Sequence, residues 1–126
     1  MTKILDTSFV YLELQDHLLI AKYKKGLKID LDIAKEVVRT RLEFANYEPV
    51  IALVHNLGVV SMDKKARDYL SSDEGVRGII AGAMVLNSPF GSFLGNFYLS
   101  VTKPKVPIKI FSSEKTAMKW LLQFKK

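Results

Sequence analysis

The stretch VIALVHNLGVVSMDKKARDYL, residues 50–70, has the pattern of a strand, a loop and a helix. Its first part, VIALVHN, would be apolar on both faces of an extended chain, which is typical of a central strand covered by helices on both sides. The following residues SMDKKARDYL carry apolar positions at helical spacing, so we expect a helix from Ser61 to about Leu70. This unit predicts an α/β protein.

Upstream of this stretch, FVYLEL at residues 9–14 and LLIAKY at residues 18–23 are rich in β-formers. The short connection QDH between them predicts an antiparallel hairpin. The next element is a helix from about Leu31 to Asn46, whose apolar positions recur every three or four residues. Asp30 stands where the N-cap of this helix is expected.

Downstream, GIIAGAMVL at residues 78–86 is a second continuous apolar strand. NSPF at residues 87–90 then opens a third helix, with Ser88 as its N-cap and Pro89 at its first position. IKIF at residues 108–111 forms a short strand, and Ser113 caps a last helix.

The element order is therefore a hairpin followed by alternating helices and strands. Such alternation favours a mixed, mostly parallel sheet, here of five strands with about four helices around it. The pattern shows no internal repeat, linker or low-complexity segment, and we expect residues 1–126 to form a single domain.

Composition narrows the class of protein. The chain has 48% hydrophobic and 25% charged residues, which is the balance of a globular protein, and it has no cysteine. The missing cysteines exclude disulfides and thiolate metal sites and fit a reducing compartment. No apolar run approaches the roughly 20 residues of a membrane span, and the first residues lack the core of a signal peptide. We expect a cytoplasmic protein.

The net charge is +6, which can attract phosphates or acidic surfaces. The basic residues, however, are scattered over several separate segments and are not interleaved with exposed aromatic residues. Lysines near helix C-termini and on solvated faces explain such a distribution. We therefore do not expect nucleic-acid binding.

Several strings of this chain resemble the SpoIIAA-like group of the STAS and SEC14-like superfamily. The strings are VIALVHN with its loop into SMDKKARDYL, NSPFGSFLGNFYL after IIAGAMVL, and the closing KPKVPIKIFSSEKTAMKWL. The resemblance covers nearly the whole chain. It implies a small bacterial, cytoplasmic α/β domain that is often dimeric, binds a partner or ligand, and has no known catalytic activity. A fold alone does not fix a function.

In anti-sigma factor antagonists of this superfamily, the corresponding loop ends in a D-S-S or D-S-T string whose hydroxyl is phosphorylated. Asp63 takes the place of the aspartate here, but Lys64 and Lys65 replace the two hydroxyl residues. Ser61 lies two positions earlier, and we interpret it as a helix N-cap. The phosphorylation switch of the family is therefore expected to be absent.

The same stretch offers a candidate loop site made of His55, Asn56, Ser61 and Asp63. His55, Ser61 and Asp63 supply the residue types of a catalytic triad, yet nothing resembles the G-x-S-x-G motif of a serine nucleophile. The two histidines lack neighbours at metal-ligand spacing, and GIIAGA lacks the dinucleotide-binding glycine pattern. We expect a protein that is not an enzyme and uses neither a metal nor a cofactor.

The third predicted helix is the second candidate site, because its aromatic residues span a wide arc around two glycines four positions apart. The residues are Phe90, Gly91, Phe93, Gly95, Phe97 and Tyr98. If part of the arc is exposed, it forms a partner surface, most simply of a homodimer, and the chain is a regulatory or interaction domain. The alternatives are a carrier that holds a small apolar ligand or lipid among these rings, and simple burial in the core.

Overall fold

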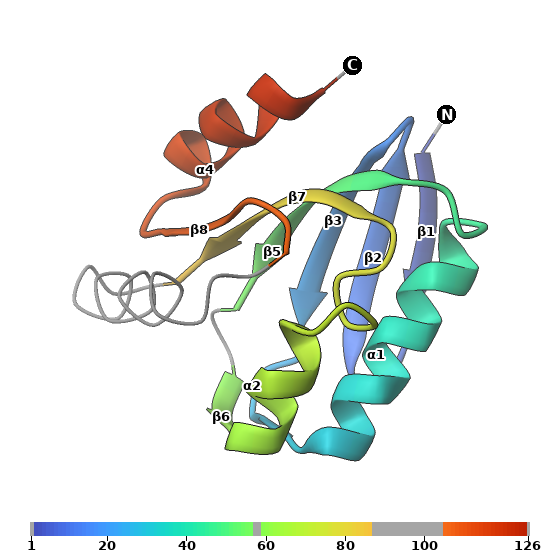
Figure 1. Cartoon of the computed structure of the whole chain (residues 1–126), viewed down its shortest axis with the longest axis vertical. Coiled ribbons are helices and arrows are strands. Elements are labelled where there is room, and N and C mark those ends of the chain that lie inside the picture. Colours follow the sequence, from blue (N-terminus) through green and yellow to red (C-terminus); the bar gives the residue numbers. More distant parts are fainter. Residues whose placement is uncertain (1, 57–58, 87–104, 126) are drawn as a thin grey trace.

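The computed structural model of the chain describes residues 2–56, 59–86 and 105–125 (Figure 1). Its main sheet has six strands in the order β1-β2-β3-β5-β7-β8. The pairs β1–β2 and β2–β3 are antiparallel, whereas β3–β5, β5–β7 and β7–β8 are parallel. The strands are β1 Thr2–Asp6, β2 Val10–Gln15, β3 Leu18–Tyr23, β5 Val50–His55, β7 Ile79–Val85 and β8 Ile108–Phe111.

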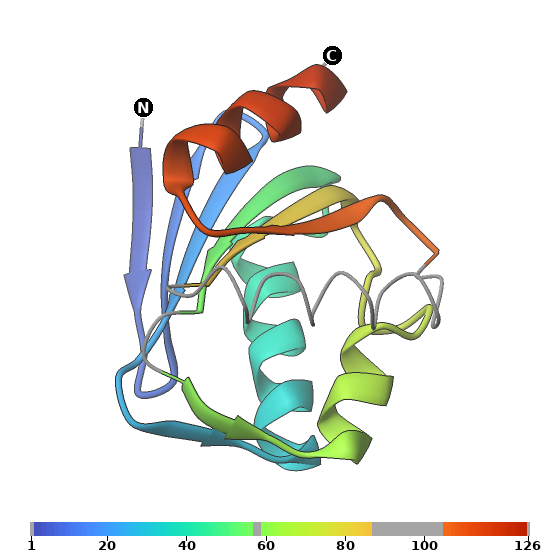
Figure 2. The same ribbon diagram turned by 90° about the vertical axis from the view of Figure 1, so that its left-hand side faces the viewer.

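A second sheet and three helices complete the described elements. The second sheet has two parallel strands, β4 Leu27–Ile29 and β6 Val59–Met62. The helices are α1 Leu31–Phe44, α2 Lys64–Leu70 and α4 Glu114–Leu121, and a 3-10 turn, Leu122–Phe124, follows α4. α1 and α2 lie on one side of the main sheet and α4 lies on the other (Figures 1 and 2).

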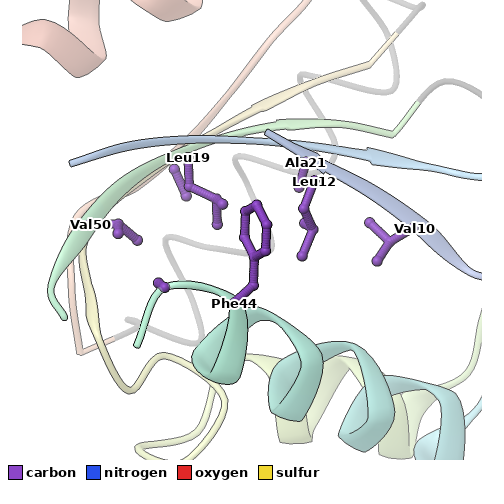
Figure 3. Packing of buried hydrophobic residues seen from close by; sticks show 8 residues of the cluster. Val10, Leu12, Leu19, Ala21, Phe44 and Val50 are labelled. Atoms are coloured by element: carbon purple, nitrogen blue, oxygen red, sulfur yellow. The ribbon is translucent and has the colours of Figure 1, made fainter. Parts of the chain in front are cut away.

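The two faces of the sheet carry separate cores, because successive side chains of a strand point to opposite faces. Phe44 of α1 packs among Val10, Leu12, Leu19 and other residues of β2, β3 and β5 (Figure 3). On the opposite face, α4 packs on a cluster that comprises Ile51, Leu53, Ala81, Ala83, Val85, Ala117 and Leu121. Val50 and Ala52 of β5 thus serve one core, and Ile51 and Leu53 the other. This confirms the predicted central strand.

Most predicted elements are confirmed. The hairpin pairs Val10 with Tyr23 and Gln15 with Leu18. The Asp30 side chain accepts a hydrogen bond of 2.9 Å from the Ile33 amide at the start of α1, and Ser113 caps α4 in the same way. The sheet is mixed and mostly parallel, as expected.

Two differences concern the number of strands and helices. The main sheet has six strands and not five, because residues 2–6 form an additional edge strand beside β2. The residues that are described contain three α-helices where about four were expected. The third predicted helix falls within residues 87–104, which lie outside the described residues.

The predicted start of the second helix, and with it the role of Ser61, was wrong. Residues 59–62 form β6, in which Ser61 is exposed and is paired with Lys28 of β4. The N-cap of α2 is Asp63, whose Oδ1 accepts a hydrogen bond of 2.8 Å from the Ala66 amide. Pairing with β4 holds Ser61 in an extended strand, so the helix begins at the next residue able to cap it.

We therefore expect substitutions of Ser61 and Asp63 to differ in their effect on stability. Asp63→Ala removes the cap and should lower the free energy of unfolding by about 1 kcal/mol. Ser61→Ala removes an exposed hydroxyl and should change it by less than about 0.5 kcal/mol. Urea denaturation of both variants checks this, and equal losses would contradict the assignment of the cap.

Candidate functional site

The carboxyl ends of β5, β7 and β8 form the edge at which ligands of open α/β sheets usually bind. His55 is the last residue of β5, and its side chain is only 14% exposed. Its Nε2 lies 3.0 Å from Oε1 of Glu114, in the first turn of α4. A carboxylate in that position is also favoured by the helix dipole. The contact joins the end of β5 to the start of the helix that covers the same face.

Asn56 follows His55 at this edge. Its backbone N–H donates a 3.0 Å hydrogen bond to the carbonyl oxygen of Val85, so β5 remains joined to β7 beyond its last residue. The side-chain Oδ1 of Asn56 is buried and has no hydrogen-bond partner among the described residues. His55 and Asn56 are thus the two members of the predicted loop site at the carboxyl end of β5.

A row of polar side chains crosses the sheet from His55 toward its other edge. The strand registers align Asp6, Tyr11, Lys22 and His55 in neighbouring strands, and because paired residues share a face, they lie on the face that carries α4. The Tyr11 hydroxyl donates a 3.0 Å hydrogen bond to Glu13, and this bond raises the pKa of Tyr11. Tyr11 is therefore a neutral hydrogen-bonding group at ordinary pH.

The remaining members of the predicted loop site have other partners. Asp63 caps α2, Ser61 pairs with β4, and the carboxylate that contacts His55 belongs to Glu114. The contact between His55 and Glu114 spans 59 positions of the sequence and was not predicted. No cluster of three or more histidine or carboxylate side chains suited to a metal occurs within residues 2–56, 59–86 and 105–125.

A hollow of about 820 Å³ lies at the opposite end of β5, and sequence reasoning did not find it. It is lined by the β2–β3 turn, the segment before β5, the start of β7 and the turn after α4. Its lining residues are Gln15, Asp16, His17, Leu18, Glu48, Pro49, Ile51, Ile80, Leu122, Phe124 and Lys125. Leu122 is 45% exposed, so part of its apolar side chain is in contact with water in this structure.

The second candidate site of the sequence falls in the third predicted helix, within residues 87–104. Phe90, Gly91, Phe93, Gly95, Phe97 and Tyr98 all lie outside the described residues. Their role as a partner or ligand surface stays a prediction from the sequence.

The mixed sheet, with α1 and α2 on one face and α4 on the other, defines a small α/β domain. The chain belongs to the family described as "Domain of unknown function (DUF7793)", whose model matches residues 12–125. No curated protein matches it. Within the described residues, no helix is both long and apolar enough to cross a membrane.

A crystal structure shows the same fold. It is that of an uncharacterized protein of the DUF3478 family with a SpoIIAA-like fold, from Shewanella loihica PV-4. The two chains are 14% identical, with a TM-score of 0.62, and the alignment covers 96% of this chain and 95% of the other. At this identity the similarity shows the fold alone. It confirms the SpoIIAA-like fold expected from the sequence.

Proposed function

We propose that this chain is a non-catalytic cytoplasmic domain that acts by binding. The residues of the predicted triad do not form one: Asp63 caps α2, and the carboxylate that contacts His55 belongs to Glu114. A serine nucleophile needs a base within hydrogen-bond reach, whereas Ser61 lies in the separate two-stranded sheet. These contacts favour a binding role over a hydrolytic one.

The observation that carries the proposal is the hollow beside the turn after α4. Its volume of about 820 Å³ falls in the range of roughly 300–1,000 Å³ that small-molecule sites occupy. Several lining residues are apolar, and one of them, Leu122, is 45% exposed. Covering such a side chain with a ligand is favourable because apolar surface leaves water.

A second version of the same function is a regulatory domain that pairs with itself or with another protein. This version depends on the sequence of the third predicted helix, in which Phe90, Phe93 and Phe97 accompany Gly91 and Gly95. A symmetric dimer through that surface would bury more than about 1,000 Å² in total. The hollow favours the ligand-binding version, and the aromatic residues favour the pairing version.

Native mass spectrometry of freshly purified protein tests the proposal, since it reports both retained small molecules and oligomer mass. We expect either a retained ligand or a dimer. In parallel, ester and phosphoester substrates should not be turned over. Turnover that disappears in His55→Ala would show a catalytic role and would overturn the proposal.

A further inference from the structure

The hollow is built by segments that meet only in the folded chain. The β2–β3 turn and the C-terminal end of α4 lie at the same end of the molecule in both views (Figures 1 and 2). Leu18 and Ile51 are register partners in adjacent strands, and both line the hollow. Together with Ile80, Leu122 and Phe124 they give it an apolar lining from three strand starts, β3, β5 and β7, and from the turn after α4.

Two of the five polar side chains of the lining are carboxylates; the five are Gln15, Asp16, His17, Glu48 and Lys125. Asp16 and Glu48 are exposed carboxylates that line the hollow. Nδ1 of His17 lies 3.2 Å from the carbonyl oxygen of Pro49. A carbonyl oxygen only accepts, so Nδ1 carries the hydrogen, and Nε2 of the neutral ring is an acceptor. Against these groups, Lys125 is the single cationic lysine or arginine side chain among the described lining residues.

We infer that this hollow binds a small amphipathic molecule with an apolar body and a cationic amine head. The apolar residues take the body, and the carboxylates of Asp16 and Glu48, with Nε2 of His17, receive the N–H groups of the head. Charge-assisted hydrogen bonds of this kind are the stronger ones. The inference rests on the proposed binding function and adds the chemical class of the ligand.

The net charge of the whole protein opposes the binding of a cationic ligand. At a net charge of +6, non-specific attraction favours an anionic amphiphile over a cationic one. A preference for the ammonium head must therefore come from local groups. Octylammonium chloride and sodium octanoate share a linear eight-carbon skeleton and carry opposite charges, so comparing them separates the two effects.

Trp120 provides the readout, because it is the single tryptophan of the chain and its ring centroid lies 4.9 Å from that of Phe124, which lines the hollow. Octylammonium, kept below the concentration at which it forms micelles, should change the Trp120 fluorescence saturably. Octanoate should bind at least tenfold more weakly. Butylammonium should also bind more weakly, by roughly fourfold for each methylene that no longer becomes buried.

Paired variants locate the binding. The double variant Asp16→Asn with Glu48→Gln should weaken octylammonium binding at least fivefold, whereas Asp32→Asn with Asp73→Asn, which changes the net charge equally, should not. Leu122→Ser should weaken it, and Val60→Ser should not. Val60 is 62% exposed and lies in β6, and Leu122 is 45% exposed, so both variants are expected to fold.

Three results would overturn the inference: no saturable change with octylammonium, equal affinity for octanoate, or equal effects of the paired variants. These failures differ from failure of the proposed function. If octylammonium does not bind but native mass spectrometry shows a dimer or another retained ligand, only the ligand class is wrong. If a His55-dependent turnover is found while octylammonium still binds, only the non-catalytic role is wrong.

Discussion

Gly75→Ala is expected to lower the free energy of unfolding by about 3 kcal/mol. A Cβ built on Gly75 would lie 2.1 Å from the Tyr69 carbonyl oxygen and 2.7 Å from the carbonyl carbon of Leu70. Both neighbours are backbone at the end of α2, so no side chain can rotate away. Overpacking of this kind usually costs about 1–3 kcal/mol, and a collision with fixed backbone belongs at the upper end. Urea denaturation measures the loss.

Substitutions of two other glycines serve as controls that distinguish steric collision from backbone strain. Gly82 lies in β7, and its added Cβ would meet Ile108 at an ordinary 3.8 Å, so Gly82→Ala should cost nothing or stabilise slightly. Gly26 has a φ of +81° with nothing near its added Cβ, and Gly26→Ala should cost about 1 kcal/mol from backbone strain alone. If Gly75→Ala costs no more than Gly26→Ala, the close approach is not rigid.

The start of α2 shows what limits prediction of the fold from the sequence. Ser61 and Asp63 are both good capping residues, so local propensity does not choose between them. The choice is made by β4, whose paired residues lie 32 or 33 positions earlier in the chain and draw residues 59–62 into a strand. Strand β1 was missed for a related reason. Among Thr2–Asp6 only Leu5 is partly buried, so the segment lacks the alternation that marks a strand facing a core.

The central elements were predictable because their own residues specify them. β5 and β7 are apolar on both faces, and only burial between two layers of helices satisfies such a pattern. The sites depend instead on which elements become neighbours. Glu114 meets His55 only because α4 follows β8 and packs across the sheet, and the hollow needs four separate segments of the chain. The hydrophobic periodicity of a segment does not show which distant elements will contact it.

Arg41→Met is also expected to lower the free energy of unfolding by about 3 kcal/mol. Arg41 lies in the last turn of α1 and is only 9% exposed. Its Nη1 donates to the Arg77 carbonyl at 2.9 Å, and its Nη2 donates to the Gly75 carbonyl at 3.1 Å. Burial lowers the pKa of the guanidinium, which still remains protonated near neutral pH. The charged donors thus hold the connection between α2 and β7 against α1.

Two opposing terms decide the size of this loss. Each hydrogen bond from a charged donor contributes about 1.5–3 kcal/mol. Methionine has no donor, so the carbonyl groups of Arg77 and Gly75 both lose this hydrogen bond. Methionine also removes a buried charge, which offsets part of the loss because no carboxylate pairs with Arg41 among the described residues. We expect the hydrogen-bond term to win, since two carbonyl groups lose their donors while one charge is relieved.

The matched control for Arg41 is Arg39, two positions earlier on the same helix. Arg39 is 56% exposed and pairs with Glu36 and Glu43 at the surface, so Arg39→Met should change stability little. Hydrogen exchange gives a local readout: in Arg41→Met, the amides of Val76 and Ile79, which donate to Ser72 and Val76, should exchange faster. If Arg41→Met is as stable as Arg39→Met, water replaces the guanidinium at both carbonyls, and the buried arginine is not what anchors this connection.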